Sequence, residues 1–288
     1  MRPILSELLD LLRLEPIEVN LFRGQSQDLG WGAVFGGQVL GQALSAAART
    51  VPPDRAVHSL HGYFLRQGDA RKPIVYEVDR IRDGRSFTTR RVVAVQGGNA
   101  IFSTSASFQV EEQGFDHQDP MPPDVPPPED LVSDAEASRA WAHALPEGLR
   151  ARALAERPIE VRSVEPWNPL TPTAQPPVRR VWYRAVDPLP DDPALHRYLL
   201  AYASDFNFLT TAMQPHGVSF ATPGMQVASL DHAMWFHRPF RMDDWLLHVI
   251  GSPSASGSRG LVRGQFFDRA GRLVASTAQE GLMRRHGS

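Results

Sequence analysis

The chain contains no cysteine among its 288 residues. Disulfide bonds, thiolate metal sites and cysteine nucleophiles are therefore excluded, and the absence fits a reducing compartment. Long hydrophobic runs are also lacking, because no apolar stretch approaches the roughly 20 residues that a membrane-spanning helix needs. The first residues enter an amphipathic pattern with acidic side chains, which is unlike a secretory signal peptide. These absences predict a cytoplasmic protein without a membrane span.

An excess of charge of either sign is missing as well. The sequence has 30 Lys and Arg against 32 Asp and Glu, a formal net charge of −2. Neither nucleic acid nor an anionic membrane surface is therefore an expected partner. Hydrophobic residues make up 42% of the chain, which is enough apolar material to bury a core and excludes extended disorder.

Several enzyme motifs are not found. The two nearest approaches to the Gly-x-Ser-x-Gly elbow of serine hydrolases, at 84–88 and 217–221, lack the final glycine. The sequence has no His-Glu-x-x-His metal motif and no Gly-Lys-Ser/Thr phosphate loop. We therefore expect neither a metal ion nor a bound cofactor.

The pattern of apolar residues predicts two similar halves, each with a helix followed by strands. The elements expected in the first half are helices at 4–14 and 38–49 and strands at 57–65, 74–81, 86–96 and 100–110. Those expected in the second half are a strand at 178–185, a long helix at 193–214 and strands at 226–237, 245–251, 260–268 and 272–283. Six prolines within 116–130 predict an extended linker between the halves.

The two halves also match in sequence. Val-His-Ser-Leu-His at 57–61 corresponds to Val-Ala-Ser-Leu-Asp at 227–231, and Ile-Phe-Ser-Thr-Ser-Ala at 101–106 corresponds to Leu-Val-Ala-Ser-Thr-Ala at 273–278. An offset of about 170 residues indicates a duplicated domain rather than a solenoid. Each unit is expected to be one helix wrapped by an antiparallel sheet, an α+β fold. The predicted domains are an N-terminal unit at 1–115, a linker with short helices at 116–158 and a C-terminal unit at 159–288.

Two such units side by side resemble the double hot-dog architecture. Six stretches together are similar to the acyl-CoA thioesterase II family across nearly the whole chain: Leu-Phe-Arg-Gly-Gln-Ser at 21–26, Val-Phe-Gly-Gly-Gln at 34–38, Tyr-Ala-Ser-Asp at 202–205, Gln-Pro-His-Gly at 214–217, Leu-Asp-His-Ala-Met-Trp-Phe-His-Arg-Pro at 230–239 and Ser-Thr-Ala-Gln-Glu-Gly at 276–281. The resemblance implies an enzyme that hydrolyses acyl-CoA, which brings CoA as part of the substrate, and a homo-oligomer.

Asp205 is the most informative carboxylate. It lies in a predicted helix that is apolar nearly all round, so it should be buried, and burial moves the pKa of a carboxyl toward that of a useful base. A structural Asp held by a neighbouring backbone group or an Arg is the alternative reading of this residue. The resemblance implies that Asp205, Ser229 and Gln279 are the catalytic residues and jointly hold a water molecule.

The duplicated half offers an internal comparison. Gln38, Ser59 and Ser107 occupy roughly the places of Asp205, Ser229 and Gln279. The N-terminal copy thus has no carboxylate at the position of the base, and we expect it to be catalytically silent. His58, His61 and His232 are interpreted as hydrogen-bonded structural residues.

Two other functions remain as alternatives. An enoyl-CoA hydratase on the same scaffold is disfavoured, because Thr210 stands where that family places a second proton-transfer residue, a histidine. A non-catalytic acyl-CoA-binding protein of the same fold is the stronger alternative, since a fold alone does not establish catalysis. The chain length of the acyl group, expected to be medium to long, depends on tunnel depth and is not fixed by these residues.

Overall fold

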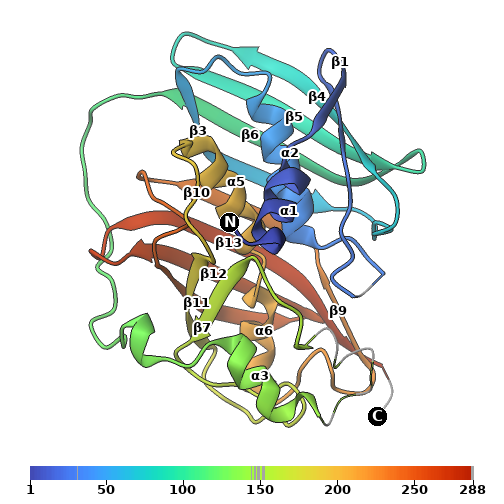
Figure 1. Ribbon diagram of the computed structural model, residues 1–288, viewed down its shortest axis with the longest axis vertical. Coiled ribbons are helices and arrows are strands. Elements are labelled where there is room, and N and C mark those ends of the chain that lie inside the picture. The colour runs from blue at the N-terminus through green and yellow to red at the C-terminus, as the bar shows by residue number, and fades with distance from the viewer. Residues whose placement is uncertain (31, 144, 146, 148–149, 151–152, 287–288) are drawn as a thin grey trace.

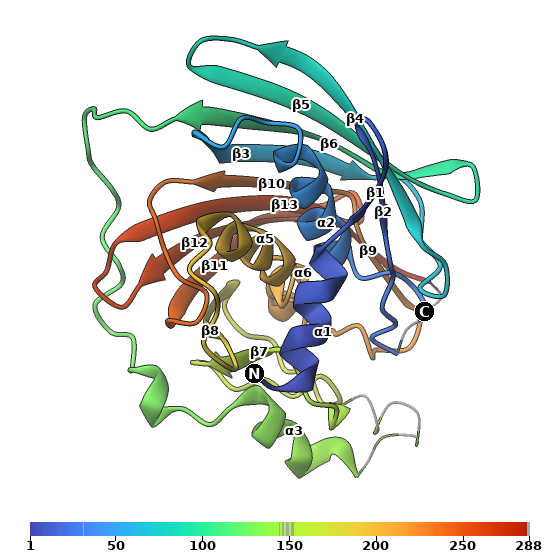
Figure 2. The same cartoon turned by 45° about the horizontal axis from the view of Figure 1, so that its top comes forward.

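One continuous antiparallel sheet organises the computed structural model, which describes residues 1–30, 32–143, 145, 147, 150 and 153–286. Within these residues the sheet has 13 strands, in the order β1-β2-β4-β5-β6-β3-β10-β13-β12-β11-β8-β7, with β9 paired to β13. The sheet curls around α2, α5 and α6, which lie together on its inner side (Figures 1 and 2).

The N-terminal unit supplies one half of the sheet. Its elements are α1 (Pro3–Leu12), β1 (Glu15–Glu18), β2 (Leu21–Gly24), α2 (Gly36–Ala48), β3 (Arg55–Phe64), β4 (Ile74–Asp83), β5 (Phe87–Gln96) and β6 (Asn99–Val110). Buried and exposed residues alternate along β5, as expected of a strand with one face on a core. The short strands β1 and β2 were not predicted, because four residues are too few to show periodicity.

The C-terminal unit repeats this order. Its strands and helices, with the segments before them, are η1 (Pro128–Asp130), α3 (Asp134–Ala142), β7 (Ile159–Ser163), β8 (Val178–Ala185), α5 (Pro193–Ala203), α6 (Phe208–Met213), η2 (Gln214–His216), β9 (Met225–Ser229), β10 (Asp231–Phe236), β11 (Leu246–Ser256), β12 (Arg259–Asp268) and β13 (Leu273–Arg285). The two units join where β10 pairs with β3, with Met234 opposite Leu60. In the described part of the chain, no helix has the length and apolar character of a membrane span.

Two predicted elements are each broken in the structure. The long helix expected at 193–214 is α5 followed by α6, with a break at 204–207 where Asn207 adopts a positive φ of 60°. The strand expected at 226–237 is β9 followed by β10, and Leu230 between them bonds both to Glu280 and to Phe64 through the backbone. Both breaks fall at the same end of the C-terminal unit, so they shape one region.

Helices α2 and α5 pack closely through glycine. A Cβ atom on Gly37 would lie 2.1 Å from the backbone oxygen of Tyr202, and one on Gly41 would lie 3.1 Å from that of Tyr198. Four residues forward along α2 thus correspond to four residues backward along α5, so the helices run antiparallel. Glycine at this spacing lets the two backbones touch, and the contact brings the start of α2 to the end of α5.

The proline-rich linker covers the outer face of the C-terminal half of the sheet. Neighbouring Leu246 and Leu247 on β11 are both fully buried, although successive strand residues point to opposite faces. Leu246 faces the helices, whereas Leu247 joins Trp182 in a second cluster against which linker residues pack. The indole N–H of Trp182 donates to the backbone oxygen of Pro126 at 3.1 Å. The segment therefore forms a strap rather than a free tether.

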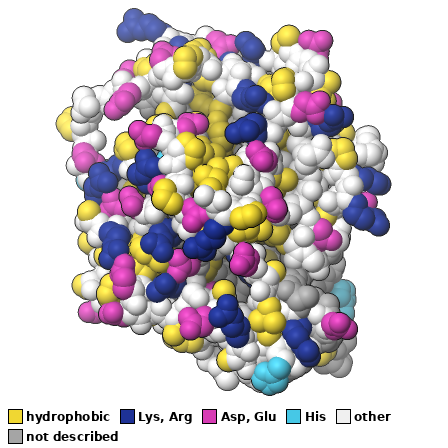
Figure 3. Space-filling model, viewed as in Figure 1, with side chains coloured by type: hydrophobic (Ala, Val, Ile, Leu, Met, Phe, Trp, Pro, Cys, Tyr) yellow, Lys and Arg dark blue, Asp and Glu magenta, His cyan; other side chains and the backbone are white. Residues whose placement is uncertain are grey.

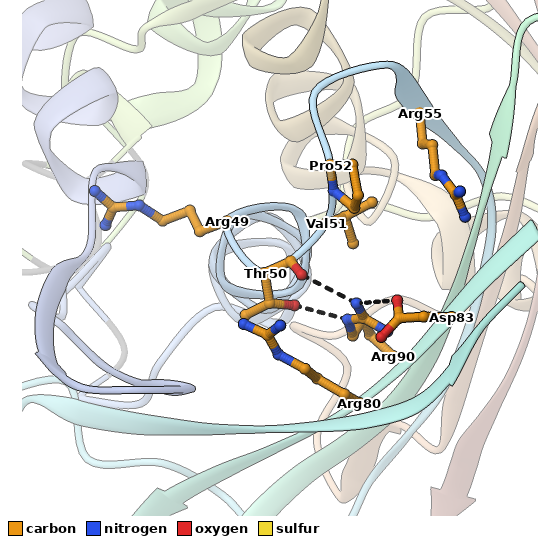
Figure 4. Close-up of a pocket in the computed structure, with 8 residues that line it drawn as sticks. All are labelled: Arg49, Thr50, Val51, Pro52, Arg55, Arg80, Asp83 and Arg90. Atoms are coloured by element: carbon orange, nitrogen blue, oxygen red, sulfur yellow. Dashed lines mark hydrogen bonds and ion pairs between the residues drawn. The ribbon is translucent and has the colours of Figure 1, made fainter.

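A buried arginine fixes the far end of α2. Arg90 on β5 is 1% exposed, and its five N–H donors find acceptors on Thr50, Arg82, Asp83 and Thr89. Figure 4 shows its bonds to Thr50, just beyond the end of α2, and to Asp83. Thr50, Asp83 and Arg90 line a cavity of about 400 Å³.

Arg90→Met is expected to lower the free energy of unfolding by about 2–4 kcal/mol, because several buried backbone carbonyls lose their donor. Urea unfolding followed by circular dichroism measures the loss. Arg91→Met is the matched control, since Arg91 is the next residue on β5 and forms an exposed ion pair with Asp79; it should cost under about 1 kcal/mol. Equal losses in both variants would contradict the structural role of Arg90.

The surface carries charges of both signs. Figure 3 shows Lys and Arg side chains interspersed with Asp and Glu over the face it presents, in keeping with the near-neutral net charge.

Candidate active site

Asp205 lies in the break between α5 and α6. Helix α5 ends at Ala203, and the backbone turns before α6 begins at Phe208. The apolar pattern predicted Asp205 inside a continuous helix, because its apolar neighbours extend through the break. Leaving the helix aims the carboxylate at the other unit: a Cβ atom on Gly36 would lie 2.6 Å from Oδ2 of Asp205. The start of α2 and the end of α5 therefore form one site.

Ser229 and Gln279 lie on adjacent strands beside this carboxylate. Ser229 ends β9, and β9 pairs with β13 so that Ser229 stands opposite Gly281. The side-chain amide of Gln279 donates from Nε2 to Oγ of Ser229 at 2.8 Å. The side chains of Ser229 and Gln279 and the backbone N–H of Gly37 lie close enough to the Asp205 carboxylate to lower its pKa as donors. The structure therefore brings the three predicted residues together.

The site has an accessible side and a buried side. Asp205 and Ser229 keep partly accessible side chains, whereas Gln279 is 1% exposed. Protein nonetheless surrounds the Asp205 carboxyl closely, and this burial raises its pKa above the ordinary value of 3.8. The neighbouring side chains of His232, Gln279 and Ser229 and the N–H of Gly37 lower the pKa, and their effect is smaller than that of burial. A carboxylate with a raised pKa is a stronger base than a solvated one.

His232 belongs to this cluster, although the sequence analysis interpreted it as structural. Its Nδ1 lies 2.6 Å from Oε1 of Gln279, and its Nε2 lies 3.0 Å from the hydroxyl of Ser204. Burial lowers the pKa of His232, so the imidazole is neutral. In the sequence, the position of His232 between Ser229 and the following aromatic residues was the only indication of a role in the site. The pairing of β10 with β13 shows which residue it contacts.

The corresponding residues of the N-terminal unit have other partners. Gln38 is buried, accepts from the backbone N–H of Gln27 and donates to the backbone oxygen of Gln25 and to Gln42. His58 bonds to Ser107 at 2.8 Å, outside the cluster around Asp205. Gln38 therefore has its amide engaged in structural hydrogen bonds.

Other groups considered in the sequence do not converge on Asp205. His61 packs edge-on against the ring of Trp235. Among the described residues, no three His, Asp or Glu side chains are grouped closely enough to hold a metal ion. The arginine-lined cavity lies beyond the other end of α2, about 20 Å from the start of that helix at its rise of roughly 1.5 Å per residue.

Comparison with known proteins identifies the family. The model of the acyl-CoA thioesterase family matches residues 149–282, and the model of the acyl-CoA thioesterase N-terminal domain matches residues 26–109. The chain is 47% identical over 284 residues to acyl-CoA thioesterase 2 of Haemophilus influenzae, an alignment that covers 99% of both chains. The chain belongs to the acyl-CoA thioesterase II family. It is accordingly an acyl-CoA thioester hydrolase.

Solved structures agree with this assignment. An acyl-CoA thioesterase II from Mycobacterium marinum shares 46% identity and superposes with a TM-score of 0.77, over 97% of this chain and 99% of that one. A hot-dog protein from Alicyclobacillus acidocaldarius, 21% identical, has a TM-score of 0.76 and shows the fold alone. Human acyl-coenzyme A thioesterase 8 is 42% identical over 287 residues, which cover 95% of this chain and 88% of the relative. The predicted double hot-dog α+β fold is confirmed.

Thioester hydrolysis needs a nucleophile that attacks the carbonyl carbon. This thioesterase has no cysteine, and the hydroxyl of Ser229 is hydrogen-bonded to the amide of Gln279, not to an imidazole. His232 bonds instead to Gln279 and Ser204. The arrangement around Ser229 therefore lacks the serine–histidine pair that a covalent serine mechanism requires. A carboxylate flanked by a hydroxyl and an amide is suited to hold and deprotonate water.

Proposed function

We propose that Asp205 is the general base that activates water for hydrolysis of acyl-CoA to free fatty acid and CoA. The observation that supports this role is the convergence of Ser229, Gln279 and the start of α2 on one buried carboxylate. Asp205 removes a proton from water as its oxygen attacks the thioester carbonyl carbon. The tetrahedral intermediate then collapses, the carbon–sulfur bond breaks, and the proton returns from Asp205 to the CoA sulfur.

Ser229 and Gln279 are proposed as ligands of the attacking water. Their side chains are already held by one another at 2.8 Å, so little orientation is lost when the water binds. The first N–H groups of α2 lie next to Asp205 and are suited to stabilise negative charge on the carbonyl oxygen. CoA enters as part of the substrate, and no bound cofactor takes part in this proposal.

Each unit has a different part in the proposed enzyme. The C-terminal unit supplies Asp205, Ser229 and Gln279, whereas the N-terminal unit supplies the start of α2 and carries no base of its own. The engaged amide of Gln38 supports a silent N-terminal copy. We also propose a homo-oligomer, because the linker residues that the structure describes pack on the outer sheet face of the C-terminal unit and leave that of the N-terminal unit available. We further propose a cytoplasmic location and medium to long acyl chains as substrates.

Thiol release from hexanoyl-CoA and palmitoyl-CoA tests this function. The wild type should release CoA from both, faster from palmitoyl-CoA, and Ser229→Ala should lower kcat by about 10- to 100-fold through loss of one hydrogen bond near a charge. Ser59→Ala, at the corresponding position of the N-terminal copy, is the matched control and should keep the wild-type rate. A protein that binds both esters without releasing thiol would instead be a non-catalytic binder.

A further inference from the structure

A chain of four hydrogen-bonded side chains runs from the interior of the C-terminal unit to the proposed water site. Ser204, His232 and Gln279 are each at most 1% exposed, and the chain ends at the partly accessible Ser229. The three links measure 3.0 Å, 2.6 Å and 2.8 Å in this order. Ser204 and His232 do not touch the water site, so they lie outside the mechanism described above.

We propose that His232 is a positioning residue that determines which end of the Gln279 amide faces the water site. The inference rests on the proposed function, because it concerns the orientation of a group that holds the attacking water. The Gln279 amide needs a group that fixes its orientation, because the oxygen and nitrogen of an amide differ in hydrogen bonding but hardly in shape. Without a neighbour that distinguishes them, Gln279 could present either atom to Asp205.

The direction of each hydrogen bond follows from the orientation that the Gln279 amide has in the structure. The amide oxygen of Gln279 can only accept, so Nδ1 of His232 must carry the proton between them. A neutral imidazole then has a bare Nε2, which can accept from the hydroxyl of Ser204 when that hydroxyl turns from its bond to the backbone oxygen of Ala201. The Gln279 amide consequently presents its NH₂ group to Ser229 and Asp205. The Nδ1–H of His232 and the NH₂ group of Gln279 therefore both point toward the carboxylate.

The reversed amide would be unfavourable for catalysis. Turning Gln279 around places Oε1 beside the Asp205 carboxylate, where two acceptors face one another and the amide offers the water no donor. It also places the NH₂ group against the Nδ1–H of His232, where two donors oppose one another. The Nδ1–H of His232 thus acts as the element that excludes the wrong orientation.

The surroundings of His232 keep it in this neutral form. Asp205 from the α5–α6 break and Asp231 from β10 favour its protonation, whereas burial disfavours it more strongly. His248 on β11 is also buried and has its pKa lowered well below the usual value, so it is neutral too. The ring of Phe208 covers the imidazole from α6, with centroids 5.8 Å apart.

Two amide substitutions separate the two ends of the imidazole. In His232→Asn the side-chain nitrogen takes the place of Nδ1 and can still donate to Gln279, while Ser204 keeps an acceptor in the backbone oxygen of Ala201 at 2.9 Å. In His232→Gln the amide reaches the place of Nε2 instead. His232→Leu has neither group. All three remove the imidazole, so they share any general loss of packing.

The test is steady-state hydrolysis of palmitoyl-CoA by the full chain and these variants. We expect His232→Leu and His232→Gln to lower kcat by about 30- to 100-fold with KM changed by less than about threefold, and His232→Asn to recover at least about tenfold in kcat. Equal kcat in the Asn and Gln variants, or losses that follow thermal stability rather than the Nδ1 position, would overturn the proposal.

A second measurement does not depend on the variants folding. Nitrogen-15 NMR of histidine-labelled wild type reports which ring nitrogen carries the proton. A neutral His232 protonated at Nδ1 supports the proposal, and one protonated at Nε2 contradicts it. Asp205→Asn is assayed in parallel: if that variant retains full activity, the proposed base is wrong, whereas an inactive Asp205→Asn with an unaffected His232→Leu rejects the positioning role alone.

Discussion

Asp205→Asn is expected to lower kcat for acyl-CoA hydrolysis by about 10²- to 10⁴-fold, the range that general-base catalysis contributes. Asparagine keeps the shape of the side chain but cannot accept a proton from water. Thiol release from palmitoyl-CoA measures the loss, and calorimetric titration with a non-hydrolysable acyl-CoA thioether should show that binding persists.

The raised pKa of Asp205 should also affect how kcat/KM depends on pH. Because burial raises the pKa of Asp205 above 3.8, kcat/KM of the wild type should fall, as pH decreases, at a higher pH than an ordinary Asp would give. The free energy of unfolding should change with pH in the direction opposite to that expected for a carboxylate in an ion pair. The folded state binds more protons than the unfolded state between the two pKa values, so ionisation of Asp205 destabilises the fold as pH rises through that window.

Asp205→Asn should consequently unfold at the same temperature as the wild type at neutral pH, or at a higher one. The control is Asp10→Asn, which changes an exposed carboxylate on α1 and should leave both activity and melting temperature unchanged. A variant that lost activity together with several degrees of stability would indicate that Asp205 holds the fold rather than the water.

Gly37→Ala should have a large effect on the stability of the fold. The added Cβ would lie 2.1 Å from the backbone oxygen of Tyr202, and backbone atoms cannot turn aside as a side chain can. Helices α2 and α5 must then separate, at a cost of about 1–3 kcal/mol or more. Chemical unfolding measures the loss, and activity should decline with it because Asp205 follows directly after α5.

Two other glycines separate stability from catalysis. Gly114→Ala adds a methyl group that meets no atom within 4 Å, so it should be neutral in both assays. Gly36→Ala would place its Cβ 2.6 Å from Oδ2 of Asp205 and 3.1 Å from the Phe64 ring, both of which are side chains. It should therefore displace the carboxylate and reduce kcat while costing less stability than Gly37→Ala. The reverse ranking of the two variants would contradict the packing described for α2.

The architecture was predictable because both halves show the same order of helix and strand patterns and contain matching sequence segments. The strands of each half keep their order, and the matching segments 101–106 and 273–278 lie in the corresponding strands β6 and β13. The catalytic roles of Asp205, Ser229 and Gln279 came from a family resemblance and stay a prediction. The structure adds that these side chains lie together.

The breaks in the chain were not predictable from periodicity. Apolar residues continue through 199–209, so the pattern gives no sign that α5 ends. The positive φ of Asn207 is imposed by tertiary packing, and asparagine tolerates this conformation better than most residues. His232 was interpreted as structural for a similar reason. Its contact with Gln279 crosses from β10 to β13. The two residues are 47 positions apart, so local sequence patterns do not reveal that they pair.

The fusion of both units into one chain has a consequence for symmetry. A site built from the helix start of one unit and the carboxylate of the other would occur twice in a dimer of identical units, and every substitution would then alter both copies. On a single chain the two faces can diverge independently. Gly36 and Gly37 need to be retained in only one unit and Asp205 in only the other, so each half is free to evolve toward a role that its counterpart does not share.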